Sequence, residues 1–268
     1  MELISDTYKQ ESAFDLFVSL QASWLFLKCG CPNIDSLLHG GILKGEITEI
    51  VGAIAVGKTQ FCLTITAEVL LNLENDDYVI YIDTNGSFRS KRLLQIINSR
   101  NSSRMQNVEY LLSRVLVIFI NDENGLNKAL DNIKRCGKKI SLLIVDSIGS
   151  ALAETSLCYL DKGKVIVDEI VEKLRSIALV FGCAVLTTNH LVFWRNSPSP
   201  SLGNRWLTAV NSRFLMEKLP NGFCIQLITS KRYQLSGEQA FYEINEKGID
   251  SLKQEDKKII SEASLISS

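Results

Sequence analysis

The sequence predicts an α/β fold: a mainly parallel sheet covered by helices on both faces, with an antiparallel edge at the carboxyl end. Apolar runs of strand length, such as Tyr78–Asp83 and Ile140–Asp146, alternate with segments of helical period. Strands that are apolar throughout are typical of parallel sheets, because both of their faces are buried. Near the carboxyl end, two further runs flank Pro220-Asn221-Gly222, which is typical of an antiparallel hairpin.

Composition fits a protein with a sizeable core that carries no strong net charge. Of 268 residues 46% are hydrophobic, the net charge is −1 and the pI is about 6.2, so any DNA contact must come from a local patch. The seven cysteines lie mostly in apolar runs, which predicts reduced thiols in an intracellular compartment. The pair in Cys29-Gly30-Cys31 has no second pair of ligands at zinc spacing.

Three regions are expected along the chain. In residues 1–40, apolar side chains from Phe14 to Leu27 fall at helical spacing, which predicts a helix that packs on the next domain or docks on a partner subunit. That segment is too short and too often interrupted by polar residues for a membrane span, and it lacks the basic start of a signal peptide. Residues 41–250 form the core, and the polar residues 251–268 a mobile tail.

Strands and helices alternate within the core. The expected strands are Ile47–Val51, Tyr78–Asp83, Val115–Ile120, Ile140–Asp146 and Cys183–Thr188, followed by Arg213–Lys218, Phe223–Thr229 and Ala240–Ile244 in the antiparallel part. The expected helices are Lys58–Leu73, Arg89–Ser99, Leu126–Arg135 and Val165–Val180.

One stretch, Gly52 to Thr59, fits the phosphate-binding pattern of Gly, four residues, Gly, Lys, then Ser or Thr. A strand leads into it and a helix leaves it, which is the context that such a loop requires and that a chance glycine turn lacks. Backbone N–H groups would cradle the phosphates, Lys58 would bring a positive charge, and the Thr59 hydroxyl would bind Mg²⁺. The candidate nucleotide-binding residues are Gly52, Ala55, Val56, Gly57, Lys58, Thr59 and Gln60.

A second motif, Leu142–Ser147, is an apolar strand that ends in an acid. The carboxyl end of a central strand faces the crevice where ligands bind in open α/β sheets. Asp146 is therefore a candidate for holding Mg²⁺ with Thr59.

The sequence resembles the RecA-type recombinases, and among them the eukaryotic recombinase paralogs, the D-type most of all. The likeness covers roughly residues 30–250 and rests on four stretches: Gly45–Gly52, Tyr81–Arg89, Leu186–His190 and Gly203–Trp206. It implies a RecA-like ATPase core that binds ATP and Mg²⁺, partner paralogs in a hetero-oligomer, single-stranded DNA, and homologous recombination repair in the nucleus.

Two departures from the family pattern limit what it implies. Active recombinases carry a glutamate, the general base, where this chain has Asn85. An amide cannot take the proton, and losing a general base is worth roughly 10²–10⁴ in rate, so hydrolysis is expected to be weak. The family also has a helical DNA-binding domain before the core, whereas about 40 residues precede Gly41 here.

Other roles follow from the resemblance alone. His190 stands where recombinases place a γ-phosphate-sensing glutamine, and Arg92 where an arginine packs against adenine. The other possibilities are a structural histidine and an ordinary exposed helix arginine. Lys231 and Arg232 resemble residues that reach a neighbour's ATP site in trans; otherwise they are strand-edge charges that deter aggregation.

Two predicted loops are candidates for single-stranded DNA. Basic groups mixed with aromatic rings suit phosphate pairing plus base stacking; the alternative is a solvated loop with a few charges. The first loop, residues 149–163, leads to Lys162 and Lys164. The second, residues 191–209, carries Trp194, Arg195, Arg205 and Trp206.

The sequence thus predicts an ATP-binding recombinase-paralog subunit with weak ATP hydrolysis and no membrane association. Two functions from other classes compete with it. One is an efficient stand-alone ATPase or small-molecule kinase, which Asn85 disfavours. The other is a structural adaptor that makes no use of nucleotide, which the intact Gly57-Lys58-Thr59 disfavours.

Overall fold

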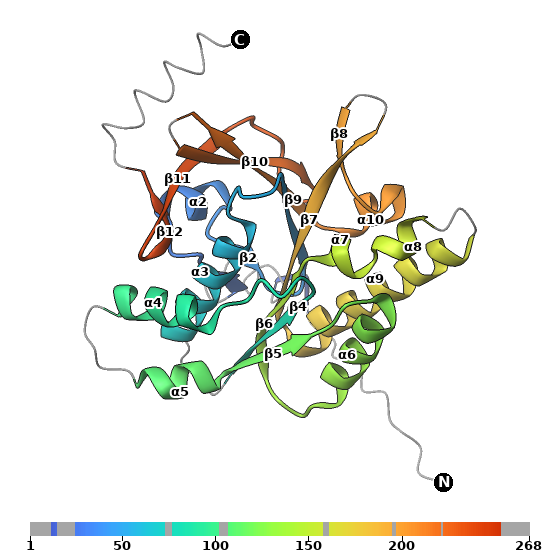
Figure 1. The fold of residues 1–268 in the computed structure, drawn as a ribbon, viewed down its shortest axis with the longest axis horizontal. Coiled ribbons are helices and arrows are strands. Elements are labelled where there is room, and N and C mark those ends of the chain that lie inside the picture. The colour runs from blue at the N-terminus through green and yellow to red at the C-terminus, as the bar shows by residue number, and fades with distance from the viewer. Residues whose placement is uncertain are drawn as a thin grey trace.

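The computed structural model describes residues 12–14, 25–72, 77–101, 107–157, 161–194, 197–220 and 222–252. Across these residues runs a ten-stranded sheet (Figure 1). In spatial order its main path is β12 (Gly248–Ser251), β11 (Gln239–Asn245), β10 (Gly222–Ser230), β9 (Ser212–Leu219), β3 (Ile47–Gly52), β7 (Ala184–Trp194), β6 (Ile140–Asp146), β4 (Tyr78–Asp83) and β5 (Val115–Phe119).

The pairing directions confirm the predicted fold class. From β9 to β5 every neighbouring pair is parallel, whereas β10, β11 and β12 are antiparallel to their neighbours. The remaining strand, β8 (Ser197–Pro200), folds back on the end of β7 as a hairpin. A separate two-stranded sheet joins β1 (Phe26–Leu27) to β2 (Ile42–Leu43).

Helices cover both faces because alternate side chains of the parallel strands are apolar in both directions. In β4, Val79 and Tyr81 face one hydrophobic cluster while Ile80 and Ile82 face the other. The first cluster is covered by α2 (Pro32–Leu37), α3 (Lys58–Leu71), α4 (Ser90–Arg100) and α5 (Val108–Ser113). The second is covered by α6 (Glu123–Arg135), α7 (Ile148–Ala151), α9 (Asp161–Phe181) and α10 (Gly203–Ala209), with α8 (Ala153–Leu157) packed on α9.

Element boundaries follow local capping. Both β4 and β6 have the predicted bounds. Helix α6 begins three residues earlier than predicted, because the side chain of Asp122 accepts a hydrogen bond from the Gly125 N–H at 2.6 Å. The short helix α5 was not predicted; Asn107 caps it in the same manner.

The start of the core differs from the prediction. Residues 15–24, most of the predicted N-terminal helix, lie outside the described residues, and its end is wrong, because Phe26–Leu27 is strand β1. Cys29, Cys31 and Ile34 are fully buried in the first cluster, so the packed core begins ahead of residue 41. At the other end, Leu252 is still buried, and residues 253–268 lie outside the described residues.

Charged residues interrupt α9, which spans 21 residues. Within the described part of the chain, no helix combines the length and the apolar character needed to cross a membrane.

Candidate nucleotide site

The phosphate-binding motif forms a loop between the carboxyl end of β3, in the middle of the sheet, and the start of α3 (Figure 1). Ala55 and Gly57 adopt left-handed backbone conformations, with φ of 66° and 100°. A Cβ at Gly52 would lie 2.5 Å from the carbonyl oxygen of Met216, so glycine lets β9 pack closely there. No side chain caps α3, which leaves its first N–H groups and its positive dipole end facing the loop.

Lys58 is held within this loop. Its Nζ donates to the carbonyl oxygens of Gly52 and Ala53, both at 2.7 Å, and the residue is only 8% exposed. Burial lowers the pKa of Lys58, and the nearby Asp146 carboxylate opposes that shift. The loop therefore places a cation beside a set of backbone N–H groups, which is the arrangement that phosphate requires.

Hydroxyl groups surround the buried carboxylate of Asp146. Thr59 and Tyr81 donate to Oδ2, both at 2.7 Å, and Thr188 donates to Oδ1 at 2.5 Å. The two residues predicted to hold Mg²⁺, Thr59 and Asp146, are thus in direct contact. No group of three or more His, Cys, Asp or Glu side chains that could hold a metal occurs among the described residues. A hydroxyl and one carboxylate fit Mg²⁺, which keeps waters and takes further oxygens from substrate phosphates.

Asn85 lies on a turn that Asp83 organises. The Asp83 carboxylate accepts from the backbone N–H groups of Asn85, Ser87 and Phe88 at 2.9–3.1 Å. The side-chain amide of Asn85 donates to Ser147 Oγ at 3.3 Å, and the same hydroxyl lies 3.3 Å from His190 Nε2. The structure therefore brings Asn85 and His190 together around one hydroxyl, next to Asp146.

Desolvation sets the protonation of His190. Burial lowers its pKa and the Lys58 charge lowers it further, while Asp146 raises it. The imidazole is therefore neutral at pH 7, able to donate from one ring nitrogen and accept at the other.

Arg92 lies on α4, against the first turn of α3. Its Nε donates to Gln60 Oε1 at 2.9 Å and its Nη2 to the Asn245 carbonyl oxygen at 2.5 Å. The guanidinium group is thus joined to the helix that starts at the phosphate loop. Gln60 orients this arginine.

The first candidate DNA loop is mostly helical. Helices α7, α8 and the start of α9 occupy residues 148–151, 153–157 and 161–163, so the predicted loop is wrong over those residues. Lys164 is exposed on the first turn of α9. Lys162 lies two residues earlier, and its side chain is outside the described part of the structure.

The second candidate loop is a hairpin followed by a helix. β7 continues to Trp194, β8 pairs back onto it, and α10 carries Arg205 and Trp206. Trp206 is fully buried, and its Nε1 donates to Glu49 Oε1 at 2.5 Å. The prediction that this ring stacks on bases is therefore wrong, because the ring is part of the core. Arg195 and the side chain of Trp194 lie outside the described residues.

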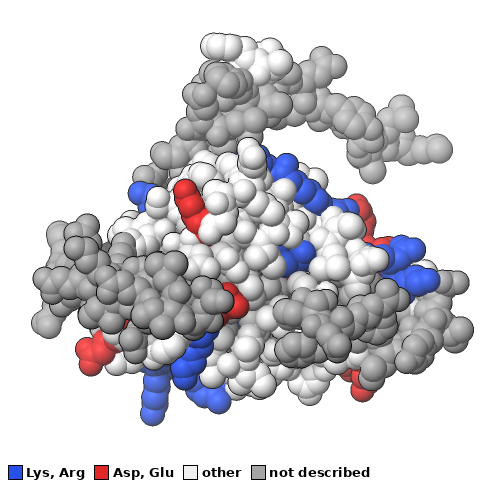
Figure 2. Space-filling view, turned by 90° about the horizontal axis from the view of Figure 1, so that it is seen from above, with Lys and Arg blue, Asp and Glu red and all other residues white. Residues whose placement is uncertain are grey.

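Charge on the hairpin side of the molecule is sparse. Arg205 is about half-exposed and forms an ion pair with Asp168 of α9. Figure 2 views the side on which β8 projects, and there the described Lys and Arg side chains stand in separate groups among neutral atoms. This distribution agrees with the net charge of −1.

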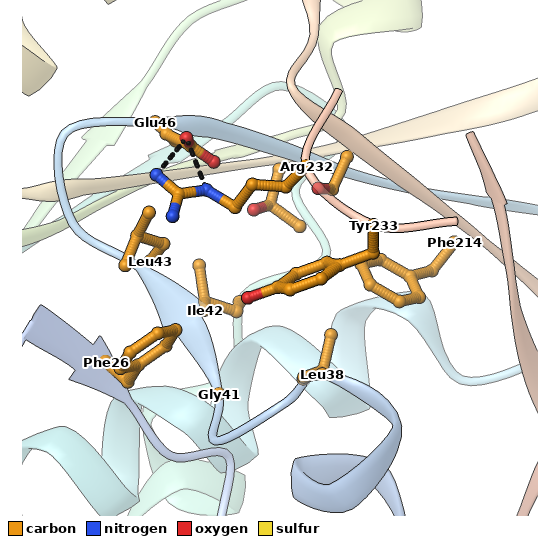
Figure 3. A pocket seen from close by; sticks show the side chains of 11 residues that line it. Phe26, Leu38, Gly41, Ile42, Leu43, Glu46, Phe214, Arg232 and Tyr233 are labelled. Carbon is orange, nitrogen blue, oxygen red and sulfur yellow. Dashed lines mark hydrogen bonds and ion pairs between the residues drawn. The ribbon is translucent and has the colours of Figure 1, made fainter. Parts of the chain in front are cut away.

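Lys231 and Arg232 lie at the opposite end of the parallel strands from the phosphate loop. They follow β10, whose Ser230 pairs with Ser212 at the amino end of β9. Lys231 Nζ donates to the Thr208 carbonyl oxygen at 2.8 Å, and Arg232 donates from Nε and Nη2 to Glu46 at 2.8–2.9 Å. Arg232 borders a small pocket that is also lined by Phe26, Leu38, Ile42, Phe214 and Tyr233 (Figure 3). Neither residue is within a strand, because β10 ends at Ser230.

A family model supplies the decisive comparison. The Rad51 model matches residues 21–205, more than half of the chain. The chain belongs to the Rad51 family. With the parallel sheet and its antiparallel edge, this match identifies the chain as a RecA-type recombinase paralog with a RecA-like core, as the resemblance implied.

The chain spans less than two thirds of one group of relatives and nearly the whole of another. The chain is 30% identical to the bovine DNA repair protein RAD51 homolog 4, over 76% of its own length and 64% of that protein. It is 30% identical to the DNA repair and recombination protein RadB of Pyrococcus furiosus, over 86% and 97% of the two chains. The crystal structure of the RadB recombinase superposes with a TM-score of 0.73 at 24% identity, covering 85% of this chain and all of that one, and shows the shared fold.

Several residues at the Rad51-family site were not predicted from sequence. Tyr81 and Asp83 lie in one of the stretches that carried the resemblance, yet neither was assigned a role. Thr188 and Ser147 also lie in stretches quoted above, Leu186–His190 and Leu142–Ser147, without an assigned role; their contacts with Asp146 and His190 depend on tertiary packing. The buried carboxylate of Glu49 had a possible sequence signal, an acid inside an otherwise buried strand.

Proposed function

We propose that the chain is an ATP-binding recombinase-paralog subunit that acts in homologous recombination and double-strand break repair in the nucleus. The observation that carries this proposal is the meeting of Lys58, Thr59 and Asp146 at one loop. The names of its relatives, which describe DNA repair and recombination proteins, support the process.

In this proposal each residue of the loop has a role toward ATP·Mg²⁺. Lys58 and the loop N–H groups hold the phosphates, Thr59 and Asp146 hold Mg²⁺, and Arg92 packs against adenine. Bound ATP·Mg²⁺ supplies the negative charge and the metal that set the conformation of the site. Tyr81 and Thr188 keep the Asp146 carboxylate in position through their hydrogen bonds.

Weak hydrolysis follows from Asn85. Its amide contacts Ser147, beside His190, so the position of a general base is filled by a group that cannot take a proton at neutral pH. His190, neutral at pH 7, orients by hydrogen bonding the group that faces it. The site thus retains nucleotide rather than turning it over.

Partners in this proposal are other recombinase paralogs, joined in a hetero-oligomer. Single-stranded DNA is bound weakly, by the side of the molecule that carries the β7–β8 hairpin, α10 and the start of α9. Lys231 and Arg232 lie too far along the sheet to serve the chain's own phosphate loop, which supports a contact in trans with a neighbour's ATP site.

ATP affinity and turnover, measured separately on the purified chain, test the proposal. We expect saturable ATP·Mg²⁺ binding with very slow hydrolysis. Lys58→Ala removes the buried cation and should weaken binding about 10- to 100-fold, the worth of a charge-assisted hydrogen bond. Lys128→Ala, which removes an exposed lysine from α6, is the matched control and should leave affinity unchanged. Asn85→Glu should raise turnover.

Two outcomes would contradict the proposal. Rapid turnover by the unmodified chain, free of contaminating ATPases, would favour a stand-alone ATPase or kinase. A folded chain that does not bind ATP, or that binds it equally well after Lys58→Ala, would favour a structural adaptor.

A further inference from the structure

Glu49 is a fully buried carboxylate in the central strand β3, three residues before the phosphate loop begins. Its Oε1 accepts from Trp206 Nε1 at 2.5 Å and from Asn189 Nδ2 at 2.9 Å, and its Oε2 forms an ion pair with Arg213. These donors come from α10, β7 and β9, so one side chain joins three elements to the strand that carries the loop.

This group is costly to bury. A carboxylate removed from water is tolerated only when it is paired and hydrogen-bonded, and an apolar residue of the same size would fill such a place without that cost. Arg213 Nη2 is buried without a partner among the described residues, which adds to the free-energy cost of burying the cluster. The free energy gained by burial therefore does not explain why these polar side chains lie in the core. Their hydrogen bonds have a fixed geometry, which gives the cluster a positioning role.

Asn189 connects this cluster to the candidate nucleotide site. Along β7, Thr188 contacts Asp146 and His190 contacts Ser147, both at the site, while Asn189 between them points to the opposite face and contacts Glu49. Because three consecutive residues of one strand move together, a displacement of Thr188 or His190 at the nucleotide site also displaces Asn189.

Asn189 also holds the base of the hairpin. Its Oδ1 accepts from Ser201 Oγ at 2.5 Å, and its Nδ2 lies 3.3 Å from the Ser201 carbonyl oxygen. Ser201 lies between the end of β8 and the start of α10. A Cβ on Gly149 would come within 2.3 Å of Asn189 Oδ1, so α7 packs closely on the same side chain.

We propose that Glu49 and Asn189 are positioning residues that make the β7–β8 hairpin and α10 respond to the occupant of the nucleotide site. The proposal rests on the proposed nucleotide-binding function. Trp206 is the group through which α10 is held, since its indole N–H is bonded directly to Glu49.

Trp206 also reports on the cluster by its fluorescence. The chain has three tryptophans, Trp24, Trp194 and Trp206, so the full-length Trp24→Phe, Trp194→Phe protein has Trp206 as its single emitter. We expect its emission to differ between the Mg²⁺-ATPγS and the Mg²⁺-ADP forms. Nucleotide affinity is measured in parallel by calorimetry.

Asn189→Ala, made in the single-tryptophan protein, removes the connection while it leaves the Trp206–Glu49 bond. We expect nucleotide affinity to stay within about twofold and the difference in emission between the two nucleotides to be lost. Thr187→Val is the matched control: Thr187 is buried two residues earlier on the same side of β7, and its hydroxyl makes only a 3.5 Å contact with the Thr48 carbonyl oxygen. The Thr187→Val protein should keep the difference in Trp206 emission between the two nucleotides.

If Asn189→Ala does not fold, Ser201→Ala tests the same connection at a half-buried position, and it should reduce the emission difference without changing affinity. Calorimetry separates the two proposals. Absence of nucleotide binding would overturn the proposed function. Nucleotide binding with no change in Trp206 emission, or with the same change in the Asn189→Ala and Ser201→Ala proteins, would overturn this inference alone.

Discussion

Three buried carboxylates on parallel strands of the sheet set the geometry of the candidate site. Asp146 gathers hydroxyl groups at the point predicted for Mg²⁺, Asp83 shapes the turn that presents Asn85, and Glu49 ties β3 to α10. Each is buried, so each depends on the hydrogen bonds that its donors make. The donors are therefore as much a part of the site as the acids.

His190 gives the site a pH dependence of known sign. Burial and the Lys58 charge lower the pKa of His190 in the folded chain below the ordinary value of about 6.5. As pH falls below 6.5 the unfolded chain takes up the proton first, which favours unfolding, and the loss of stability ends once the folded state is protonated as well. Above pH 7 the histidine is neutral in both the folded and the unfolded chain, and its protonation no longer affects the free energy of unfolding.

We therefore expect the unmodified chain to lose more free energy of unfolding than His190→Gln between pH 7.5 and pH 5.5. Urea denaturation at the two pH values measures this difference. His39, the other histidine, is present in both proteins and cancels. Equal losses of free energy of unfolding in the two proteins would show that His190 is not desolvated in the folded chain.

The sequence identified the residues proposed to hold the nucleotide better than the residues that support them. Lys58, Thr59 and Asp146 follow a fixed spacing, and the structure brings them together at one loop. Tyr81 and Thr188 reach Asp146 only because β4, β6 and β7 lie side by side, which no local pattern specifies. The same reason explains Trp206: beside arginine in a polar stretch it resembled a stacking platform, whereas the fold buries it against Glu49.

At the scale of elements, the strands with continuous apolar runs were predictable and the segments after them were not. The bounds of β4 and β6 were predicted to the residue, because a short run that is apolar almost throughout is typical of a strand buried on both faces. The Ser- and Pro-rich segment after β7 was predicted as a loop, but it continues as β8 and α10. Prolines are tolerated in β8 because it pairs on one side only, with β7.

The hairpin and α10 carry a prediction about DNA. Arg205 is paired with Asp168, but an exposed pair is worth only about 0–1 kcal/mol, so a phosphate can displace the carboxylate. If Arg195 and Arg205 both bind phosphates of single-stranded DNA, replacing both with alanine should lower the salt slope of log affinity by about 0.7 per contact. Oligothymidylate titrations at four salt concentrations measure the slope.

Lys128→Ala, which removes an exposed lysine from α6, is the control for loss of positive charge and should leave the slope unchanged. Asp168→Asn should strengthen binding, because it releases Arg205. An unchanged slope in the double arginine variant would mean that DNA contact comes from the partners of this chain.

At the scale of the whole molecule, the sheet separates two predicted nucleotide contacts. The phosphate loop follows the carboxyl end of β3, whereas Arg232 follows β10 near the amino end of that same strand. One chain therefore offers a site at one end of its parallel strands and a cation at the other. In an assembly of paralogs, that polarity lets the cation of one subunit meet the site of the next.

Arg232 has a local partner that such a contact must replace. Its ion pair with Glu46 is partly exposed, with side-chain exposures of 34% and 18%, and a pair of this kind contributes about 0–1 kcal/mol. A triphosphate offers more charge and more acceptors than one carboxylate, so transfer of the guanidinium group is favourable. Arg232→Ala in the isolated chain should accordingly change the free energy of unfolding by no more than about 1 kcal/mol and leave its own ATP affinity intact.

In the co-purified paralog complex, the same Arg232→Ala change should reduce ATP turnover or weaken ATP binding about 10- to 100-fold, since a charge-assisted contact to phosphate is lost. Steady-state ATPase assays and calorimetry on the intact complex measure the two quantities. Lys218→Ala removes an exposed cation from the β9–β10 hairpin at the other end of the strands and is the matched control. If the complex keeps its full ATP affinity and turnover without Arg232, the arginine serves only its bond to Glu46, and the neighbouring subunit completes its own site.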